Sequence, residues 1–219
     1  MCDIFIVMNT YTRDESIIFG KNSDRNCDEP QLLLQEPRMK HNLSKEPMLK
    51  ATYIQIPQVE ETYEVVLSKP SWMWGCEMAF NEFGVVIDNE AVFTREALGS
   101  AALTGMDIVR IAAERSKTSD EALDIIIRLL ENHGQGGNCG YRHTLHYHNG
   151  FIIADPHNAW ILEAAGKYWA AKKVHDYCII SNGLSIGSDF DRCHPPVIQN
   201  AIDKKYCKQA HGFNFTKAL

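Results

Sequence analysis

The order of the apolar segments along the chain constrains the fold more than any other feature. Short runs rich in β-branched and aromatic residues occupy the first and last thirds, and two stretches of helical periodicity lie between them. Strands are expected at 3–8, 17–19, 53–56, 63–67, 151–154, 159–163, 168–172 and 177–180, with a hairpin or tight connection over 79–87 and helices over 106–115 and 118–133. Because strands and helices do not alternate as they do in βαβ units, the pattern predicts the α+β class.

The chain is expected to form a single domain over residues 1–219, because it contains no internal repeat, no low-complexity segment and no linker. Residues 28–50 carry three prolines and many charges, so they are expected to form a long surface loop. Thr118 and Glu121 have the spacing of a capping box, which predicts the start of the second helix.

Composition excludes several classes of function. The net charge is −6 and no cluster of Lys and Arg occurs, so the chain is not expected to bind nucleic acid. No apolar run approaches the roughly 20 residues of a membrane span, and the N-terminus lacks the pattern of a signal peptide. These features predict a cytoplasmic protein with no membrane partner.

The cysteines and histidines predict neither a disulfide framework nor a metal site. Seven cysteines occur at irregular spacings without a C-x-x-C pair, which is typical of free thiols in a reducing compartment. His143, His146 and His148 lie close together, but no acidic or cysteine ligand stands at a telling distance from them. We therefore expect no metal and no cofactor.

The cysteine at position 2 allows a catalytic interpretation. Removal of Met1 would place a thiol and a free α-amine on one residue, Cys2. A thiol is a weak nucleophile at neutral pH until a base or a positive charge assists it, and an α-amine can accept its proton. The alternative is a small apolar residue at the head of a strand.

Three further segments carry candidate site residues. In "FGKNSDR" (19–25), Lys21 can favour a nearby thiolate and Asp24 can orient an amine, although an ordinary charged turn has the same composition. Asn81 precedes a glycine and an apolar strand, where its amide can donate to an oxyanion or simply form a turn. Asn182, in "SNG", is a turn residue or a second amide donor near the nucleophile.

Taken together, the motifs resemble the secernin/C69 dipeptidase family in family order and over nearly the whole chain. They include "MCD", "FGKNSDRNCDEPQ", "FNEFGVVIDNEAVFTRE", "ADPHNAWILEAAGKYWAAKKV" and "SNGLSIG". The resemblance implies an N-terminal nucleophile hydrolase with a four-layer αββα sandwich.

The resemblance also implies roles for the candidate residues. Cys2 matches the nucleophile that is exposed when the preceding residue is removed, and Lys21 and Asp24 match the basic residue and the aspartate after the second strand. Lys21 keeps the charge where several relatives have arginine, without the forked contacts of a guanidinium. Asn81 matches the oxyanion asparagine, and Asn182 matches the second asparagine of the site.

The chain departs from the family in length, because the resemblance implies members of about twice 219 residues. The chain is therefore expected to correspond to the N-terminal portion of the family's full length, with an incomplete sandwich and an exposed apolar face. We expect a cysteine-type dipeptidase that acts on a dipeptide or small amide, and we also consider a homo-oligomer. The alternatives are a hydrolase of non-peptide amides and an inactive secernin-like binding protein.

Overall fold

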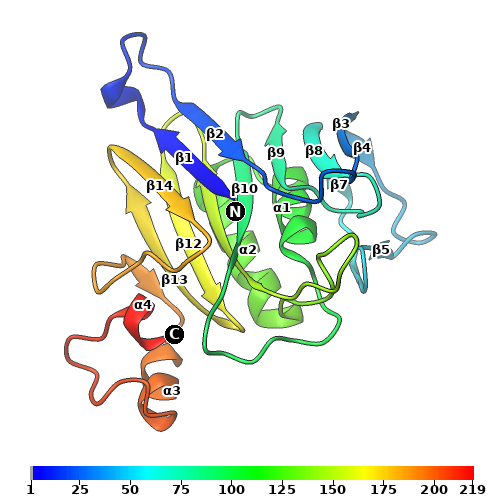
Figure 1. Ribbon diagram of the computed structural model, residues 1–219. Helices are drawn as coiled ribbons and strands as arrows, with labels where there is room; N and C mark the ends of the chain where they lie inside the picture. The colour runs from blue at the N-terminus through cyan, green and yellow to red at the C-terminus, as the bar shows by residue number, and fades with distance from the viewer. Residues whose placement is uncertain (1) are drawn as a thin grey trace.

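Antiparallel pairing joins eight strands into the main sheet of the computed structural model, which describes residues 2–219 (Figure 1). Along the sheet the order is β15-β13-β12-β11-β10-β9-β8-β3. The strands are β3 (Gln31–Glu36), β8 (Val65–Pro70), β9 (Met78–Asn81), β10 (Val86–Val92), β11 (His148–Ala154), β12 (Ala159–Ala165), β13 (Tyr168–Val174) and β15 (Arg192–Cys193).

A smaller sheet of three strands lies against one face of the main sheet (Figure 1). Its order is β14-β1-β2, with β1 (Asp3–Val7) between β2 (Ile18–Asn22) and β14 (Tyr177–Ser181). Two short pairs lie outside both sheets: β4 (Met39–Lys40) with β7 (Glu61–Thr62), and β5 (Met48–Lys50) with β6 (Gln55–Pro57).

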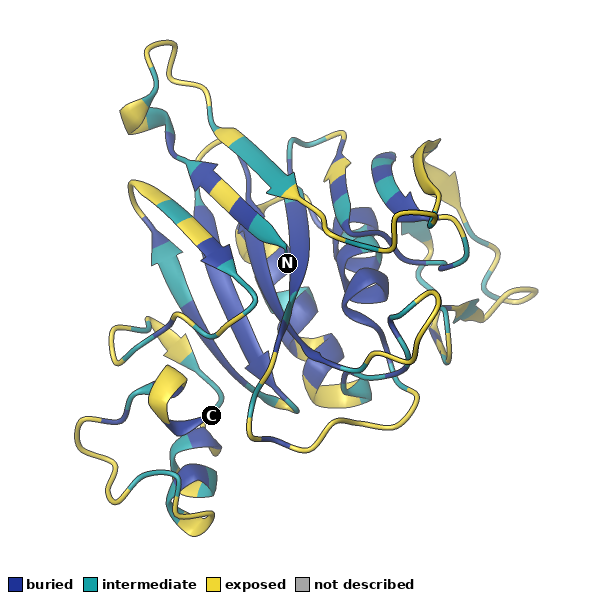
Figure 2. Cartoon of the chain, in the orientation of Figure 1, coloured by how far each residue is buried: buried dark blue, intermediate teal, exposed yellow. Residues whose placement is uncertain are grey.

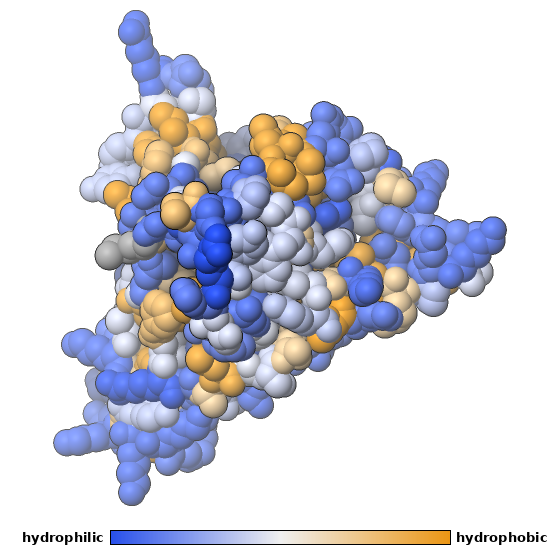
Figure 3. Space-filling model, turned by 45° about the vertical axis from the view of Figure 1, so that its right-hand side comes forward, coloured by the Kyte–Doolittle hydropathy of each residue, from blue (hydrophilic) through white to orange (hydrophobic). Residues whose placement is uncertain are grey.

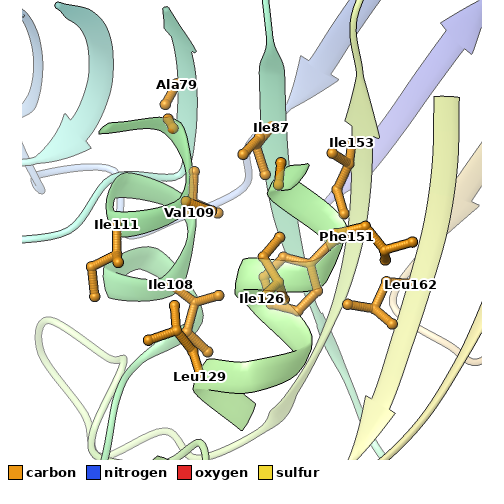
Figure 4. Close-up of a cluster of buried hydrophobic side chains, with 14 of the residues drawn as sticks. Ala79, Ile87, Ile108, Val109, Ile111, Ile126, Leu129, Phe151, Ile153 and Leu162 are labelled. Carbon is orange, nitrogen blue, oxygen red and sulfur yellow. The ribbon is translucent and has the colours of Figure 1, made fainter. Parts of the chain in front are cut away.

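Two helices, α1 (Gly105–Arg115) and α2 (Ser119–His133), cover the opposite face of the main sheet. Their apolar sides meet alternate side chains of the central strands in one buried cluster, which Figure 4 shows around Ile108, Ile126 and Phe151. This burial stabilises the helices far more than their intrinsic propensity does.

A second apolar cluster fills the space between the two sheets. It contains Ile4 and Ile6 of β1, Ile152 of β11 and Ile161 of β12. The short elements near the C-terminus, α3 (Val197–Asp203) and α4 (Phe215–Ala218), add to the same cluster, and the 3-10 turn Asn9–Tyr11 joins β1 to β2. The described residues therefore build three layers, helix, sheet and sheet.

The outer face of the three-stranded sheet is exposed (Figure 2). Apolar side chains point outward there, including Phe5, Ile18, Tyr177 and Ile179, and the last two are 64% and 66% exposed. In the part of the chain that the structure describes, no helix covers this face.

The predicted α+β class is confirmed, and so are the hairpin at 79–87 and the two central helices. The predicted capping box is half formed: Thr118 accepts from the Glu121 N–H at 3.2 Å, but the Glu121 carboxylate accepts from Lys117 N at 2.8 Å. A complete capping box starts α1 instead, between Thr104 and Asp107.

The prediction of one long loop over 28–50 is wrong. That segment contains β3, β4 and β5, and β3 pairs with β8 along its full length. Pro30 and Pro37 bound β3, and most of its side chains are exposed because it is the edge strand of the sheet. An exposed edge strand lacks the alternation of buried and polar residues by which strands are predicted.

None of the helices formed by the described residues has the length and apolar character needed to cross a lipid bilayer.

Candidate active site

A cavity of about 360 Å³ opens beside Cys2, near the lower end of the range for small-molecule sites, roughly 300–1,000 Å³. It lies where the N-terminal end of β1, the end of β2 and the middle of β10 meet. Its lining residues are Cys2, Lys21, Asp24, Arg25, Glu77, Asn89, Glu90, Ala91, Phe93, Leu145, Tyr147 and Asn182.

Segments that flank β1 on both sides hold Cys2. Its backbone N donates to Asn182 Oδ1 at 2.7 Å, and its carbonyl accepts from Ser181 Oγ at 3.2 Å. From the other side, Asp24 N donates to Cys2 Sγ at 3.5 Å. The register explains this arrangement, because Asp3 pairs with both Ser181 and Asn22, so Cys2 lies beside the residues that follow β14 and β2.

Lys21 lies on the inner side of β2 and reaches across to the main sheet. Its ammonium forms a buried ion pair with Asp88 Oδ1 at 2.8 Å and also donates to the carbonyls of Asn89 and Glu77, the latter at 3.3 Å. Three acceptors thus receive the three hydrogens of the ammonium, which fixes a positive charge at the cavity wall.

The electrostatics of this pair favour a protonated lysine. Burial alone lowers the pKa of Lys21, but the carboxylates of Asp88 and Glu77 and the thiolate form of Cys2 together raise it above its usual value. Burial raises the pKa of Asp88 to about 7, against the opposing effect of Lys21.

Arg25 forms the adjacent wall with two carboxylates. Its guanidinium makes two hydrogen bonds to Glu29, at 2.6 and 2.9 Å, and a third to Glu77 Oε1 at 3.0 Å. It also donates to the carbonyl of Cys139 at 3.0 Å, and Trp72 donates to Glu29 at 2.7 Å. This network ties the segment after β2 to the main sheet and keeps Asp24 beside Cys2.

Asn89 and Glu90 form the part of the wall that β10 contributes. Glu90 is 2% exposed, and neither of its carboxyl oxygens has a hydrogen-bond partner among the described residues. Burial, reinforced by neighbouring carboxylates and opposed by Lys21, raises the pKa of Glu90 to about 8. Asn182 is anchored to the same strand, because its Nδ2 donates to Ala91 O at 2.8 Å.

The structure brings four of the five predicted site residues together: Cys2, Lys21, Asp24 and Asn182 all line the cavity. Removal of Met1, which the prediction requires, concerns a residue outside those that the structure describes.

Asn81 is not brought to this group. Its Nδ2 donates to the carbonyls of Ala113 and Ser116 at 2.9 and 2.8 Å, and its Oδ1 accepts from Phe83 N and Val85 N. Both amide hydrogens are therefore occupied at the end of α1, and neither is available to an oxyanion. We do not carry the predicted oxyanion role of Asn81 forward.

Sequence reasoning missed Asn89 and Glu90, although both stand in the quoted stretch "VVIDNEAVF". The available signal was the run Asp88–Asn89–Glu90 inside an otherwise apolar strand. Polar residues buried in the middle of a sheet are costly unless partnered, so such a run indicates a site. Among the described residues no cluster of three or more His, Cys, Asp and Glu side chains has a geometry that could hold a metal ion.

Solved structures of other proteins share the fold of this chain. A mutant of the conjugated bile acid hydrolase from Clostridium perfringens matches with a TM-score of 0.58 at 12% identity, over 84% of this chain and 54% of that one. Penicillin V acylase from Agrobacterium tumefaciens matches with a TM-score of 0.55 at 11% identity, over 83% and 52%. The fold is that of the N-terminal nucleophile hydrolases, and the chain spans about half the length of these two proteins.

The family follows from the sequence. The model of peptidase family C69 matches residues 2–218, and the chain belongs to this family.

Proposed function

We propose that the protein is a cysteine-nucleophile amide hydrolase that cleaves dipeptides. The observation that carries the proposal is the position of Cys2, whose thiol lines the cavity while its backbone nitrogen is bound to Asn182 and its sulfur to Asp24 N. Membership of a peptidase family supports the reaction class. Loss of Met1 would turn the bound nitrogen of Cys2 into a free α-amine.

In the proposed mechanism the Cys2 α-amine accepts the thiol proton, and Asn182 Oδ1 orients that amine. Lys21 and the Asp24 N–H favour the thiolate, which attacks the scissile carbonyl carbon. The carbonyl oxygen becomes an oxyanion. One hydrogen of Asn182 Nδ2 is bound to Ala91 O, and we assign the other to the oxyanion, an interaction commonly worth roughly 3–4 kcal/mol.

Collapse of the tetrahedral intermediate breaks the C–N bond, and the Cys2 α-ammonium gives its proton to the leaving amine. The product is a thioester between Cys2 and the acyl group. Water then attacks the thioester and passes a proton to the α-amine, which releases the acid and restores the thiol.

Intact mass and one substitution test this proposal. We expect a mass lower than the full sequence by one methionine residue, and Cys2→Ala should lower kcat for dipeptides by about a thousandfold or more. Cys27→Ala is the matched control, because Cys27 is an exposed thiol outside the lining of the cavity and its loss should leave turnover unchanged. A retained Met1, or full activity in Cys2→Ala, would refute the mechanism.

The two alternatives give different results. A hydrolase of non-peptide amides would act on N-acyl amides in a Cys2-dependent manner and leave dipeptides intact. A non-catalytic binding protein would turn over neither. Its Cys2 would also react with iodoacetamide no faster than the other thiols, among which burial raises the pKa of Cys139 and Cys178 to about 11.

A further inference from the structure

Two residues that line the cavity, Asn89 and Glu90, carry buried side-chain oxygens that lack a hydrogen-bond partner. These oxygens are Asn89 Oδ1 and both carboxyl oxygens of Glu90, none of which receives a hydrogen bond within residues 2–219. A buried oxygen without a donor costs about 1–3 kcal/mol, and more if it is charged. A bound molecule with hydrogen-bond donors would remove this cost.

The orientation of Asn89 is determined by a chain of amides behind it. Gly166 O requires a donor, so Gln135 places Nε2 there at 2.7 Å and turns Oε1 to Asn149 Nδ2 at 2.8 Å. Asn149 Oδ1 must then accept from Asn89 Nδ2, at 2.9 Å. Asn89 Oδ1 is therefore the amide atom without a partner. Turning any one of these amides over would break a hydrogen bond of the chain, so the Asn89 amide cannot present its NH₂ group at this position.

The cations that line the cavity, by contrast, are engaged within the protein. All three hydrogens of the Lys21 ammonium have acceptors, and Arg25 makes four hydrogen bonds to Glu29, Glu77 and Cys139. The cavity therefore lacks a spare buried cation for a substrate carboxylate among its described lining residues, while it has spare buried acceptors.

Two hydrogen bonds through Asn182 connect the residue that follows Glu90 to Cys2. Glu90 precedes Ala91, whose carbonyl holds Asn182 at 2.8 Å, and Asn182 in turn holds Cys2 N at 2.7 Å. On the neighbouring strand β11 the residue opposite Glu90 is Gly150, so no side chain from that position covers the carboxyl. The charges that act on Glu90 come from Lys21 and from the carboxylates of Asp3, Asp88 and Glu163. This surplus of carboxylates favours a cationic ligand.

We propose that the Glu90 carboxylate binds the α-ammonium group of the substrate and so selects dipeptides with a free amino terminus. In a dipeptide the α-amine is carried by the carbon bonded to the scissile carbonyl, so its acceptor has to lie near the nucleophile, and Glu90 lines the same cavity as Cys2. The inference rests on the proposed dipeptidase function and names the residue that would determine its specificity.

The test compares alanylalanine with N-acetylalanylalanine, which differ only at the amine. Binding is measured by calorimetry on the Cys2→Ala protein, with and without Glu90→Gln, and turnover is measured on the protein that retains Cys2. We expect alanylalanine to bind about tenfold more tightly than its acetylated analogue, or more tightly still. Glu90→Gln should weaken binding of alanylalanine about 10- to 100-fold and raise its KM. The affinity for the acetylated analogue should change little.

The acetylated analogue controls for folding, because a misfolded variant would lose binding of both compounds. Equal binding of the two by the Cys2→Ala protein, or an unchanged preference in Glu90→Gln, would overturn the inference. A preference that is lost in Asp24→Asn and kept in Glu90→Gln would overturn it as well. Failure of the Cys2-containing protein to hydrolyse either compound would refute the proposed function alone, since the binding preference would still decide the role of Glu90.

Discussion

At the scale of the residue, a buried carboxyl without a donor makes stability depend on pH. The folded pKa of Glu90 is about 8 and its ordinary value is 4.5. The charged groups that act on it are Lys21 from β2, Asp3 from β1, Glu163 from β12 and Asp88 from its own strand. Between these two pKa values the folded protein holds a proton that the unfolded chain has released, so stability falls as pH rises through this window.

Glu90→Gln removes this titration and keeps the shape of the side chain. We expect the wild-type protein to lose stability between pH 5 and 8.5 by up to several kcal/mol more than the variant does. Urea unfolding at the two pH values measures the difference, and the pH dependence that remains in the variant reports the other titrating groups. An identical pH slope in the two proteins would show that Glu90 is already ionised in the folded state at low pH.

At the scale of the element, Asn81 connects the β9–β10 turn to the end of α1. Its amide donates to the Ala113 and Ser116 carbonyls while its oxygen accepts from Phe83 N and Val85 N. The last carbonyls of a helix lack partners within the helix, so a side chain that binds them stabilises the helix end.

Asn81→Ala leaves these buried groups without partners, and we expect it to cost about 3 kcal/mol of unfolding free energy. Asn132→Ala, an exposed asparagine near the end of α2, serves as the control and should change stability by less than about 0.5 kcal/mol. Chemical denaturation measures both variants. A large loss of kcat in Asn81→Ala at unchanged stability would instead support the oxyanion role that the structure does not place there.

The elements also show how far sequence reasoning reaches. The periodicity of α1 and α2 is local, so their positions were predicted from the sequence. The edge strand β3 was missed because its exposed residues carry no buried face, and its existence depends on β8, whose first residue lies about 30 positions away.

At the scale of the whole molecule, the three-layer arrangement leaves one apolar sheet face open to solvent. Outward side chains of β1, β2 and β14 contribute to it, and exposed apolar side chains form separate patches on an otherwise largely hydrophilic surface (Figure 3). Exposed apolar faces on a sheet favour association with another protein surface.

We propose that this face mediates self-association of the chain. The mass measured by light scattering should therefore rise with concentration, and Ile179→Lys should suppress the rise because it places a charge on the 66% exposed position of β14. Ser44→Lys adds the same charge at an exposed loop position and should leave the rise unchanged. A monomeric wild-type protein at all concentrations would contradict this prediction.

The sequence by itself determined the succession of strands, two helices and strands, the α+β class and the three segments that carry Cys2, Lys21, Asp24 and Asn182. These follow from local periodicity and from motifs that can be read one segment at a time. Only the tertiary structure decided which polar residues face the cavity. Asn81 and Asn89 lie on adjacent strands, yet packing against α1 uses both amide hydrogens of Asn81, while Asn89 lines the cavity beside Cys2. The burial of Glu90 also depends on layers that come from distant parts of the chain, and no local pattern encodes it.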